Sequence, residues 1–411
     1  MIYIILLIAL LLPSYFLGLI KPESLRIGGS IDNHVMIIGF SLILIPYLIK
    51  NINIHKKIKY LFVVVLFILF QVLYSLYMGI NFNEIGTTLR YDYYTPIIAT
   101  LVLAWAYSAS DKELVNLFRY ILVLTVVQLF FFIVFHLTGF NIFQVPIHSE
   151  YIVGGKEVAR YNLAFPRFTW LLALFLLYKF FKTKSNKYIL FMIFPLLGEI
   201  LTSHRSSIIA WVVFFFIVYC FTFIYNRKLK VNFVKLVPIF LILLISIGIY
   251  FFLFPEYFVF LSDRFAPILA NLDPNSAYNF QFRIDLINRA YDNIINSNIL
   301  FGMGYQRAAT YGQYDLAFGR DTGLAAVLYT EGMVGLFVRF LPIIYLIKIN
   351  YKDIKISLNY ENRVISILSL AFILSQLVNI VQTQMFRNYM LYIFVFFIIE
   401  ILKQRNISND R

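Results

Sequence analysis

The stretch SSIIAWVVFFFIVYCFTFIY, at residues 206–225, decides the fold because it contains no charged side chain. A helix that spans a membrane needs about 20 predominantly apolar residues. Comparable apolar runs occur at residues 2–20, 35–49, 60–80, 93–108, 114–138, 161–181, 188–203, 233–254, 323–347, 364–380 and 388–402. The sequence therefore predicts an all-α polytopic membrane protein with about 12 transmembrane helices.

The composition indicates the same class. Of 411 residues, 61% are hydrophobic and 14% are charged, and the mean hydropathy is +0.79. Soluble domains are about 45–50% apolar and about 25% charged, so a soluble enzyme, a secreted disulfide scaffold and a disordered protein are excluded. The one cysteine, Cys220, cannot form an internal disulfide. The run at 2–20 lacks a basic segment before it and a small-residue cleavage site, so we expect a retained first span.

Lysine is concentrated in alternate connections between the predicted spans. With about 12 spans, one side of the membrane holds Lys50, Lys56, Lys57, Lys59, Lys112, Lys179, Lys182, Lys184, Lys187, Lys228, Lys230, Lys235, Lys348, Lys352, Lys355 and Lys403. Only Lys21 and Lys156 fall on the other side. The positive-inside rule makes the lysine-rich side cytoplasmic and places both termini there. The net charge of +14 is therefore mostly a topology signal, which excludes a nucleic-acid partner.

The outer side carries arginine instead of lysine. These arginines are Arg26, Arg90, Arg160, Arg205, Arg264, Arg283, Arg289, Arg307, Arg320 and Arg387, and Arg167 lies just inside a span. Membrane topology alone would not select arginine there. A guanidinium stays charged when buried and binds phosphate or carboxylate with two parallel hydrogen bonds. The pattern predicts that an anionic ligand is handled on the outer face.

One outer connection is much longer than the others. It covers residues 255–322. Spans one to nine precede it in residues 1–254, and spans ten to twelve with a cytoplasmic tail follow it in residues 323–411. Long connections with structure of their own are usually functional. The spacing of apolar residues predicts an amphipathic helix over 281–297 that lies along the membrane surface or packs on the spans. A second, shorter outer loop covers residues 139–160.

Two arginines of the predicted loop helix differ in their surroundings. Arg283 projects from the apolar face, where a cation is costly unless it is paired, so it either snorkels to the surface or binds an anion. Arg289 lies on the polar face, where it is solvated or pairs with Asp285. The position of Arg283 makes it the better candidate for an anionic ligand.

Three further arginines lie at span ends. Arg160 and Arg167 bracket the start of span six on nearly one helix face, and Arg167 alternatively forms a structural ion pair with Glu199 or another carboxylate. Arg205 lies in a tight outer turn at 202–206, beside hydroxyl side chains and a helix start. Free backbone N–H groups at a helix start bind phosphate, so this turn is a candidate phosphate cradle, or Arg205 is only an interfacial anchor.

The segment from residue 302 onward adds three features. The run GMGY at 302–305 predicts positive φ angles or a close backbone approach. Arg320 and Asp321 precede span ten, where Asp321 either caps the helix or acts on an acceptor hydroxyl. Glu331 lies within span ten. The sequence contains no nucleotide-binding phosphate loop and no metal-ligand spacing, so we expect no cofactor and no metal.

Three segments carry a resemblance to a known family. TSHRSSIIAW (202–211), RIDLINRAYDNIINSNILFGMGY (283–305) and YTEGMVGLFVRF (329–340) resemble the O-antigen polymerase and O-antigen ligase superfamily. That family places Ser-Arg in a tight outer turn, then an arginine-led helix running into a Gly-x-Gly loop. A Glu-x-Gly segment follows and opens the next span. The order, the spacing and the large outer loop agree over roughly residues 160–345.

The resemblance implies a multi-pass glycosyltransferase of the bacterial inner membrane, similar to GT-C-type enzymes. Its donor would be an oligosaccharide on undecaprenyl pyrophosphate, used on the periplasmic face. The family's pyrophosphate-binding arginines correspond here to Arg205 and Arg283, and less closely to Arg160 and Arg167. The pyrophosphate leaving group already activates the donor, so neither cofactor nor metal is required. Arginines can stabilise the charge that develops on it.

These expectations assign roles on the outer face. We expect Arg205, Arg283 and Asp321 to be catalytic, and Arg264, Arg289 and Arg320 to add to the substrate-binding surface. The partners implied are the lipid bilayer, the lipid-linked oligosaccharide and a polysaccharide chain-length regulator.

One departure from the family selects among its activities. Ligases of the family carry His-Asn before the span that follows the loop, whereas this chain reads GRDTGLAAVLYTEG at 319–332, without histidine. The sequence therefore favours a polymerase that makes an O-antigen, capsule or exopolysaccharide, with a ligase as the nearest alternative. A lipid-linked oligosaccharide flippase is an alternative of a different class, but a transporter should show two comparable halves and midplane binding groups.

Overall fold

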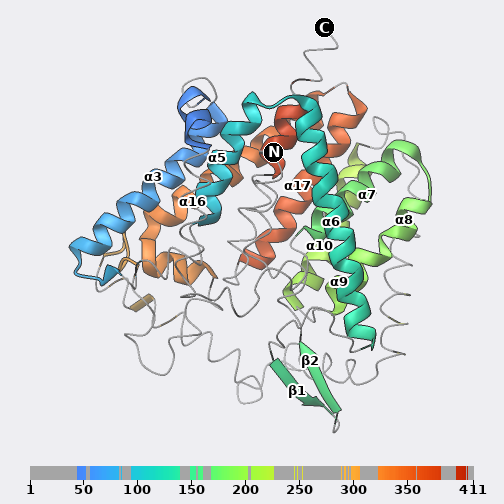
Figure 1. Ribbon diagram of the computed structural model, residues 1–411, viewed down its shortest axis with the longest axis horizontal. Coiled ribbons are helices and arrows are strands. Elements are labelled where there is room, and N and C mark those ends of the chain that lie inside the picture. The colour runs from blue at the N-terminus through green and yellow to red at the C-terminus, as the bar shows by residue number, and fades with distance from the viewer. Residues whose placement is uncertain are drawn as a thin grey trace. The chain divides into compact units, whose positions relative to one another are not determined.

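The structure is a computed structural model of the chain (Figure 1). It describes residues 44–51, 56–82, 85, 94–138, 149–153, 156–160, 168–201, 205–225, 245, 248, 252, 288, 291–292, 295, 298–305, 323–357, 359–380, 395–403 and 405. The helices are α3 (Lys56–Tyr77), α5 (Tyr94–Ser108), α6 (Asp111–Thr138), α7 (Thr169–Thr183), α8 (Lys187–Phe191), α9 (Ile193–Leu201), α10 (Arg205–Ile224), α16 (Gly323–Ile356) and α17 (Tyr360–Ile380). Residues 44–51 and 395–403 are also helical.

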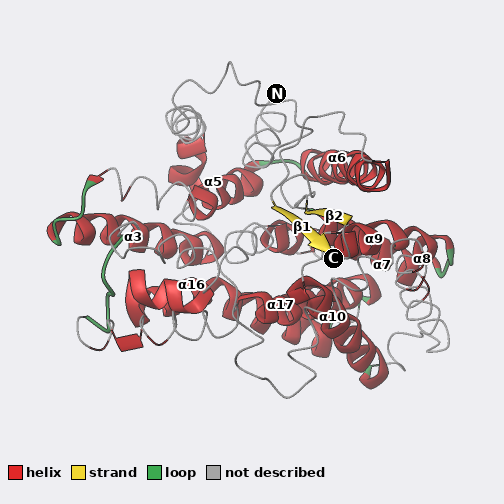
Figure 2. Cartoon of the chain, turned by 90° about the horizontal axis from the view of Figure 1, so that it is seen from below, coloured by secondary structure: helices red, strands yellow, loops and turns green. Residues whose placement is uncertain are grey.

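The helical character expected from the apolar runs is confirmed (Figure 2). Within the described residues, Asp111–Val134, Ser207–Ile224 and Val327–Ile356 are long and apolar enough to cross a membrane. The predicted spans at 93–108 and 206–225 match α5 and α10 within one residue at each end. Of the predicted loop helix, residues 288, 291, 292 and 295 are helical and exposed, and its other residues lie outside the described part.

Local sequence sets where α6 begins. The backbone N–H of Ser110 donates to Glu113 Oε2 at 2.8 Å, and the N–H of Glu113 donates to Ser110 Oγ at 3.3 Å. This is a capping box, which satisfies two backbone donors at the helix start. The cap separates α5 from α6 with only two residues between them.

The chain divides into two compact units. Unit 1 contains residues 1–26, 116–277 and 350–375, and unit 2 contains residues 27–115, 278–349 and 376–411. Each unit therefore combines segments that are distant in the sequence.

In unit 1, α7 and α17 pack antiparallel. Trp170, at the start of α7, contacts Phe372, in the second half of α17, with ring centroids 5.4 Å apart. At the other end of α7, Lys182 pairs with Glu361 at 2.7 Å. Trp170 also stacks on Trp211 of α10 with ring centroids 3.8 Å apart, so three helices meet at one aromatic cluster.

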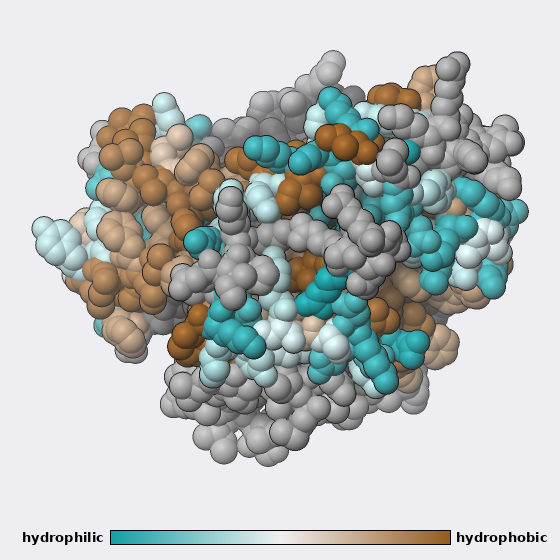
Figure 3. All heavy atoms as spheres, turned by 90° about the horizontal axis from the view of Figure 1, so that it is seen from above, coloured by the Kyte–Doolittle hydropathy of each residue, from teal (hydrophilic) through white to brown (hydrophobic). Residues whose placement is uncertain are grey.

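In unit 2, α3 packs against residues 298–305 and α16. Their buried contacts include Phe67, Ile68, Tyr305 and Val338. The opposite side of α3 exposes large apolar residues, among them Leu69 (53%) and Leu73 (67%). Figure 3 shows apolar side chains gathered on the left, the side on which Figure 1 places α3 and α16. A lipid-facing helix surface has this composition.

The structure differs from the expected spans in the run at 188–203. It is not one helix but two, because α8 ends at Phe191 and α9 begins at Ile193. Pro195 has no backbone N–H to donate to the carbonyl of Phe191, so a continuous helix would lose that bond. Proline is tolerated in the first turn of a new helix, which is where Pro195 lies in α9.

The region 139–160, which the sequence predicts to be an outer loop, contains short strands that the apolar pattern did not indicate. Strands β1 (Ser149–Val153) and β2 (Lys156–Arg160) pair antiparallel, with Val153 opposite Lys156 and Ser149 opposite Arg160. Residues 154 and 155 are both glycine, the type of pair that two-residue hairpin connections favour.

The predicted tenth span is also broken. In α16, Gly332 has φ 67° and ψ −167°, so two helical segments meet there at a kink. An L-residue rarely adopts this φ, and the break depends on glycine. The kink is the centre of the candidate functional site.

Candidate functional site

The structure describes few of the arginines predicted to bind an anion. Arg205 is the first residue of α10, and α9 ends at Leu201; the three residues of the predicted tight turn between them lie outside the described part of the chain. Arg160 ends β2 opposite Ser149. The other predicted site residues lie outside the described part of the chain, namely Arg167, Arg264, Arg283, Arg289, Arg320 and Asp321.

Two segments that carry the family resemblance lie against each other in unit 2. We call residues 298–305 the glycine turn. Its Met303 N–H donates to the carbonyl of Tyr329 at 2.7 Å, and its Gly304 N–H donates to that of Thr330 at 3.1 Å. Beyond the kink, the N–H of Met333 donates back to the carbonyl of Ile299 at 3.0 Å.

The N–H of Val334 adds a fourth bond, to the carbonyl of Leu300 at 3.1 Å. The kink at Gly332 breaks the regular ladder of α16, and the glycine turn supplies replacement partners on both sides of the break. This satisfies backbone groups that would be costly to leave unpaired at membrane depth.

Glycine is required at this contact for two reasons. Gly302 and Gly304 have φ of 69° and 80°, as the GMGY run predicted. A Cβ on Gly332 would lie 2.3 Å from the carbonyl oxygen of Leu300, and one on Gly302 would lie 2.5 Å from that of Tyr329. Real Cβ atoms do not approach backbone so closely, so both backbones depend on the missing side chains.

A buried ion pair bridges the kink. Arg339 Nε donates to Glu331 Oε2 at 2.7 Å and Arg339 Nη2 donates to Oε1 at 2.6 Å, so the contact is bidentate. The two side chains are 7% and 1% exposed. Glu331 precedes the kink and Arg339 follows it, so the pair connects the two halves of α16. Gly335 leaves the necessary room, since a Cβ there would lie 2.8 Å from Glu331 Oε2.

The glycine turn and α3 complete the polar contacts around this pair. The hydroxyl of Tyr305 donates to Glu331 Oε1 at 3.2 Å, and its backbone N–H donates to Ser75 Oγ at 2.8 Å. Gln71 Nε2 donates to the carbonyls of Phe301 at 2.9 Å and Glu331 at 3.3 Å. One amide of α3 therefore contacts both the glycine turn and the residue before the kink.

The buried side chains of this site hold two segments of the chain together. The Glu331 carboxylate already accepts hydrogen bonds from Arg339 and Tyr305, which is the arrangement that makes a buried charge tolerable. We call Glu331, Arg339 and Tyr305 the kink clamp. It holds a turn in the second half of the 255–322 loop onto a helix long and apolar enough to cross a membrane.

Sequence reasoning missed most of the kink clamp. It placed Glu331 in span ten but did not pair it with Arg339, and it gave Gln71 no role. Two signals were present: an arginine deep in an apolar run is usually functional or paired, and Glu331, Gly335 and Arg339 recur at every fourth residue.

A second buried acid lies in unit 1. Glu199 of α9 is 5% exposed and forms side-chain hydrogen bonds with Ser207 of α10 and Trp170 of α7. Its α9 leads directly into the turn before Arg205, so this acid joins the helices that flank a predicted phosphate cradle. Arg167, the partner that the sequence alternatively predicts for Glu199, lies outside the described residues.

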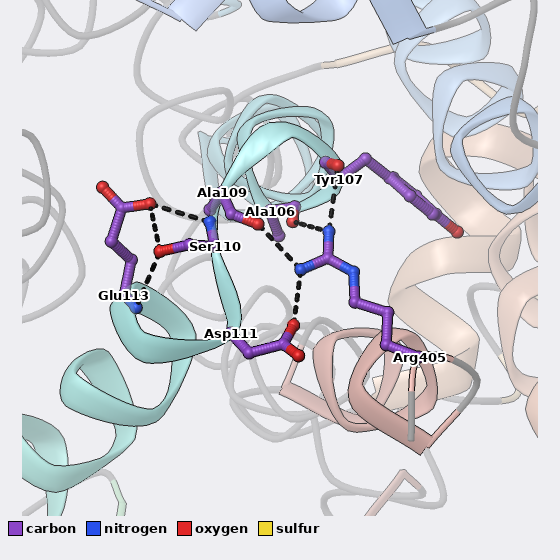
Figure 4. A network of polar contacts seen from close by, with 7 residues as sticks. All are labelled: Ala106, Tyr107, Ala109, Ser110, Asp111, Glu113 and Arg405. Atoms are coloured by element: carbon purple, nitrogen blue, oxygen red, sulfur yellow. Dashed lines mark hydrogen bonds and ion pairs between the residues drawn. The ribbon is translucent and has the colours of Figure 1, made fainter. Parts of the chain in front are cut away.

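A third polar cluster, in unit 2, lies where α5 ends (Figure 4). Arg405 Nη1 donates to the carbonyl of Ala109 and to Asp111 Oδ1, at 2.7 and 2.8 Å. Its Nη2 donates to the carbonyls of Ala106 and Tyr107, at 3.3 and 3.0 Å. The guanidinium therefore satisfies carbonyls at the C-terminal end of α5, where a cation is favourable.

Two comparisons bear on the family resemblance. No family model fits this sequence, and no curated protein is similar to it. The family resemblance therefore rests on the motifs of the chain itself.

Proposed function

We propose that this chain is a membrane glycosyltransferase that polymerises lipid-linked oligosaccharide repeat units into a surface polysaccharide. The donor is a glycan on undecaprenyl pyrophosphate. The acceptor hydroxyl forms a bond to the anomeric carbon of the donor while the bond from that carbon to the pyrophosphate breaks. The hydroxyl proton passes to a base, and undecaprenyl pyrophosphate leaves.

The contact between the glycine turn and the kink carries this proposal. The segment that contains Gly302-Met303-Gly304 and the segment that contains Glu331-Gly332 are separate parts of the motif series that resembles the superfamily. Four backbone hydrogen bonds join them in the structure. A chance resemblance between loose motifs would not require the two to pack together, so the contact supports interpreting them as one unit.

The membrane features support the wider architecture that we propose. Three described helices are long and apolar enough to cross a membrane. We propose about 12 spans of GT-C-like architecture, with both termini in the cytoplasm of a bacterium and the 255–322 loop in the periplasm. The alternation of lysine between connections supports this orientation.

We propose the following roles for the outer arginines. Arg205 and Arg283 stabilise the charge that develops on the pyrophosphate, and Asp321 accepts the proton of the acceptor hydroxyl. Arg160, Arg167, Arg264, Arg289 and Arg320 add positive charge to the substrate-binding surface. A chain-length regulator is the proposed protein partner.

Deletion of the gene in the host, followed by restoration, tests the function. Gel analysis of surface glycans is combined with extraction of lipid-linked sugars. We expect the polysaccharide ladder to collapse to single attached repeat units and to return on restoration. Long polymer left on the carrier lipid would indicate a ligase instead, and single units trapped on the cytoplasmic side would indicate a flippase.

A further inference from the structure

We propose that the kink clamp positions the glycine turn, and with it the segment of the 255–322 loop that leads into the turn, for the polymerisation reaction. The clamp residues Glu331, Arg339 and Tyr305 would be positioning residues that do not touch the substrate. This inference rests on the proposed function for its catalytic consequence. The structural coupling that it asserts can be tested without that function.

The first argument is the position of the pair relative to the kink. Glu331 is the last residue before Gly332, and Arg339 is in the helix that follows. A bidentate contact fixes the direction of both side chains as well as their distance. The angle between the two halves of α16 is therefore tied to a contact that is almost entirely shielded from water.

The second argument is that the glycine turn binds both halves. It donates to the carbonyls of Tyr329 and Thr330 before the kink, and it accepts from Met333 and Val334 after it. A change in the kink angle would therefore move either the carbonyls before the kink or the N–H groups after it away from the glycine turn. The hydroxyl of Tyr305, at the end of the turn, binds the same carboxylate that Arg339 holds.

The third argument concerns what the turn carries. In the sequence, Arg283 and Arg289 lie in the segment that leads into the turn. A clamp that fixes the end of this segment limits where these arginines can reach. Alignment with the transition state is sensitive to small displacements, since a shift of about 1 Å can cost about 100-fold in rate.

A pair of thiols reports the position of the turn directly. Ile299 and Met333 are 52% and 51% exposed, and the N–H of Met333 donates to the carbonyl of Ile299. We would introduce Ile299→Cys and Met333→Cys together in a Cys220→Ser background, which removes the one native thiol. The yield of disulfide under mild oxidation then measures how often the two positions meet.

The clamp is removed as a neutral pair, Glu331→Gln with Arg339→Gln, because a single change would leave one buried charge unpaired. In the thiol background, we expect this double variant to lower the disulfide yield at least about fivefold relative to the intact clamp. Tyr305→Phe keeps the ion pair, so it folds readily and serves as the second variant, with a smaller decrease. An unchanged yield in both variants would overturn the inference.

Polymer synthesis gives a second readout. With the thiols reduced, the double variant should make about tenfold less polymer than the protein with the intact clamp, at an equal protein level. Oxidation should restore synthesis in proportion to the fraction of molecules that form the disulfide, and a reducing agent should abolish the recovery, because the disulfide replaces the clamp in those molecules. A role in stability alone predicts full synthesis whenever the protein level is equal, and that result would contradict positioning. If the intact protein makes no polymer, the proposed function fails, while the disulfide yields still decide the coupling.

Discussion

Two ion pairs, one in each unit, have nearly the same length but different surroundings. Arg339 and Glu331 in unit 2 are 2.6 Å apart, and Lys182 and Glu361 in unit 1 are 2.7 Å apart. The first pair is 7% and 1% exposed, whereas the second is 45% and 43% exposed. Distance alone would rank them as equals. Solvent decides between them, because water screens the exposed pair and is excluded from the buried one.

The difference also determines what each pair can do. A buried pair is not a large net source of stability, since both charges lost their hydration. It does make the geometry hard to change, because the loss of either partner leaves a bare charge. The clamp in α16 therefore suits a fixed joint, and the pair between α7 and α17 suits a tolerant surface contact.

Removing one carboxylate from each pair should give the largest contrast. Glu331→Gln leaves the Arg339 guanidinium buried without its counterion, so we expect a loss of about 3–5 kcal/mol. The matched change Glu361→Gln should cost at most about 1 kcal/mol. Thermal unfolding of the two purified variants in one detergent checks this. Equal shifts in Tm would contradict the account.

The kink that shapes the buried pair can be broken through its glycine. Gly332→Ala combines a left-handed backbone with a Cβ only 2.3 Å from the carbonyl oxygen of Leu300. Gly79 is a matched control, because its φ is +78° but nothing lies within 4 Å of its added Cβ. We expect the free energy of unfolding to fall by about 3 kcal/mol for Gly332→Ala. For Gly79→Ala we expect it to fall by about 1–2 kcal/mol, from backbone strain alone. Similar losses in thermal unfolding at both positions would argue against the close contact.

The loss of stability on breaking the Arg405 cluster should lie between the losses expected for the two ion pairs. Arg405 is 27% exposed and its partner Asp111 is 43% exposed. Arg405→Ala removes the donor to several carbonyls at the end of α5, so we expect a loss of about 1–2 kcal/mol. Asp111→Asn removes one charge and leaves those carbonyl contacts, and should cost less. If Asp111→Asn destabilises as much as Arg405→Ala, the carbonyl contacts are not the main contribution.

The smallest effect should be the pH dependence of the exposed pair. The hydrogen bond from Lys182 is the main cause that lowers the pKa of Glu361, and the same bond is the main cause that raises the pKa of Lys182. Because its pKa is lowered, the Glu361 carboxyl contributes stability at pH values above the ordinary pKa of Glu. This contribution is lost as the pH falls through the lowered pKa. Because its pKa is raised, Lys182 contributes stability at pH values below the ordinary pKa of Lys. This contribution is lost as the pH rises through the raised pKa.

We therefore expect the difference in Tm between the native chain and Glu361→Gln to be constant near neutral pH. It should disappear in acid below the ordinary Glu range, and 1 M salt should reduce it at neutral pH. A difference that persists in strong acid would show that charge is not its source.

The periodic apolar runs were enough to predict the long helices. The run at 206–225 has no competing signal, and α10 follows it closely. The breaks in other runs were harder to predict, because a proline or glycine inside an apolar run is compatible with a kink, a new helix or no change. Pro195 lies in the first turn of α9, just after the break between two helices, whereas Pro342 lies inside α16.

The backbone conformation of the candidate site could be predicted better than its side-chain partners. The GMGY run predicted positive φ angles or a close backbone approach, and Gly302 and Gly304 both have positive φ. The contact between Tyr305 and Glu331 joins positions far apart in the sequence, and Gln71 is more distant still. Such contacts depend on how helices pack, which a single sequence does not encode in its local pattern.

Reconstitution of the purified full-length chain tests the central claim most directly. The protein is placed in lipid vesicles with an undecaprenyl-pyrophosphate-linked repeat unit, and the glycans and free carrier lipid are followed over time. We predict a ladder of lipid-linked polymer and the release of one undecaprenyl pyrophosphate for each bond formed, without added nucleotide. A donor that stays intact, or that moves across the bilayer without forming any new glycosidic bond, would contradict the account.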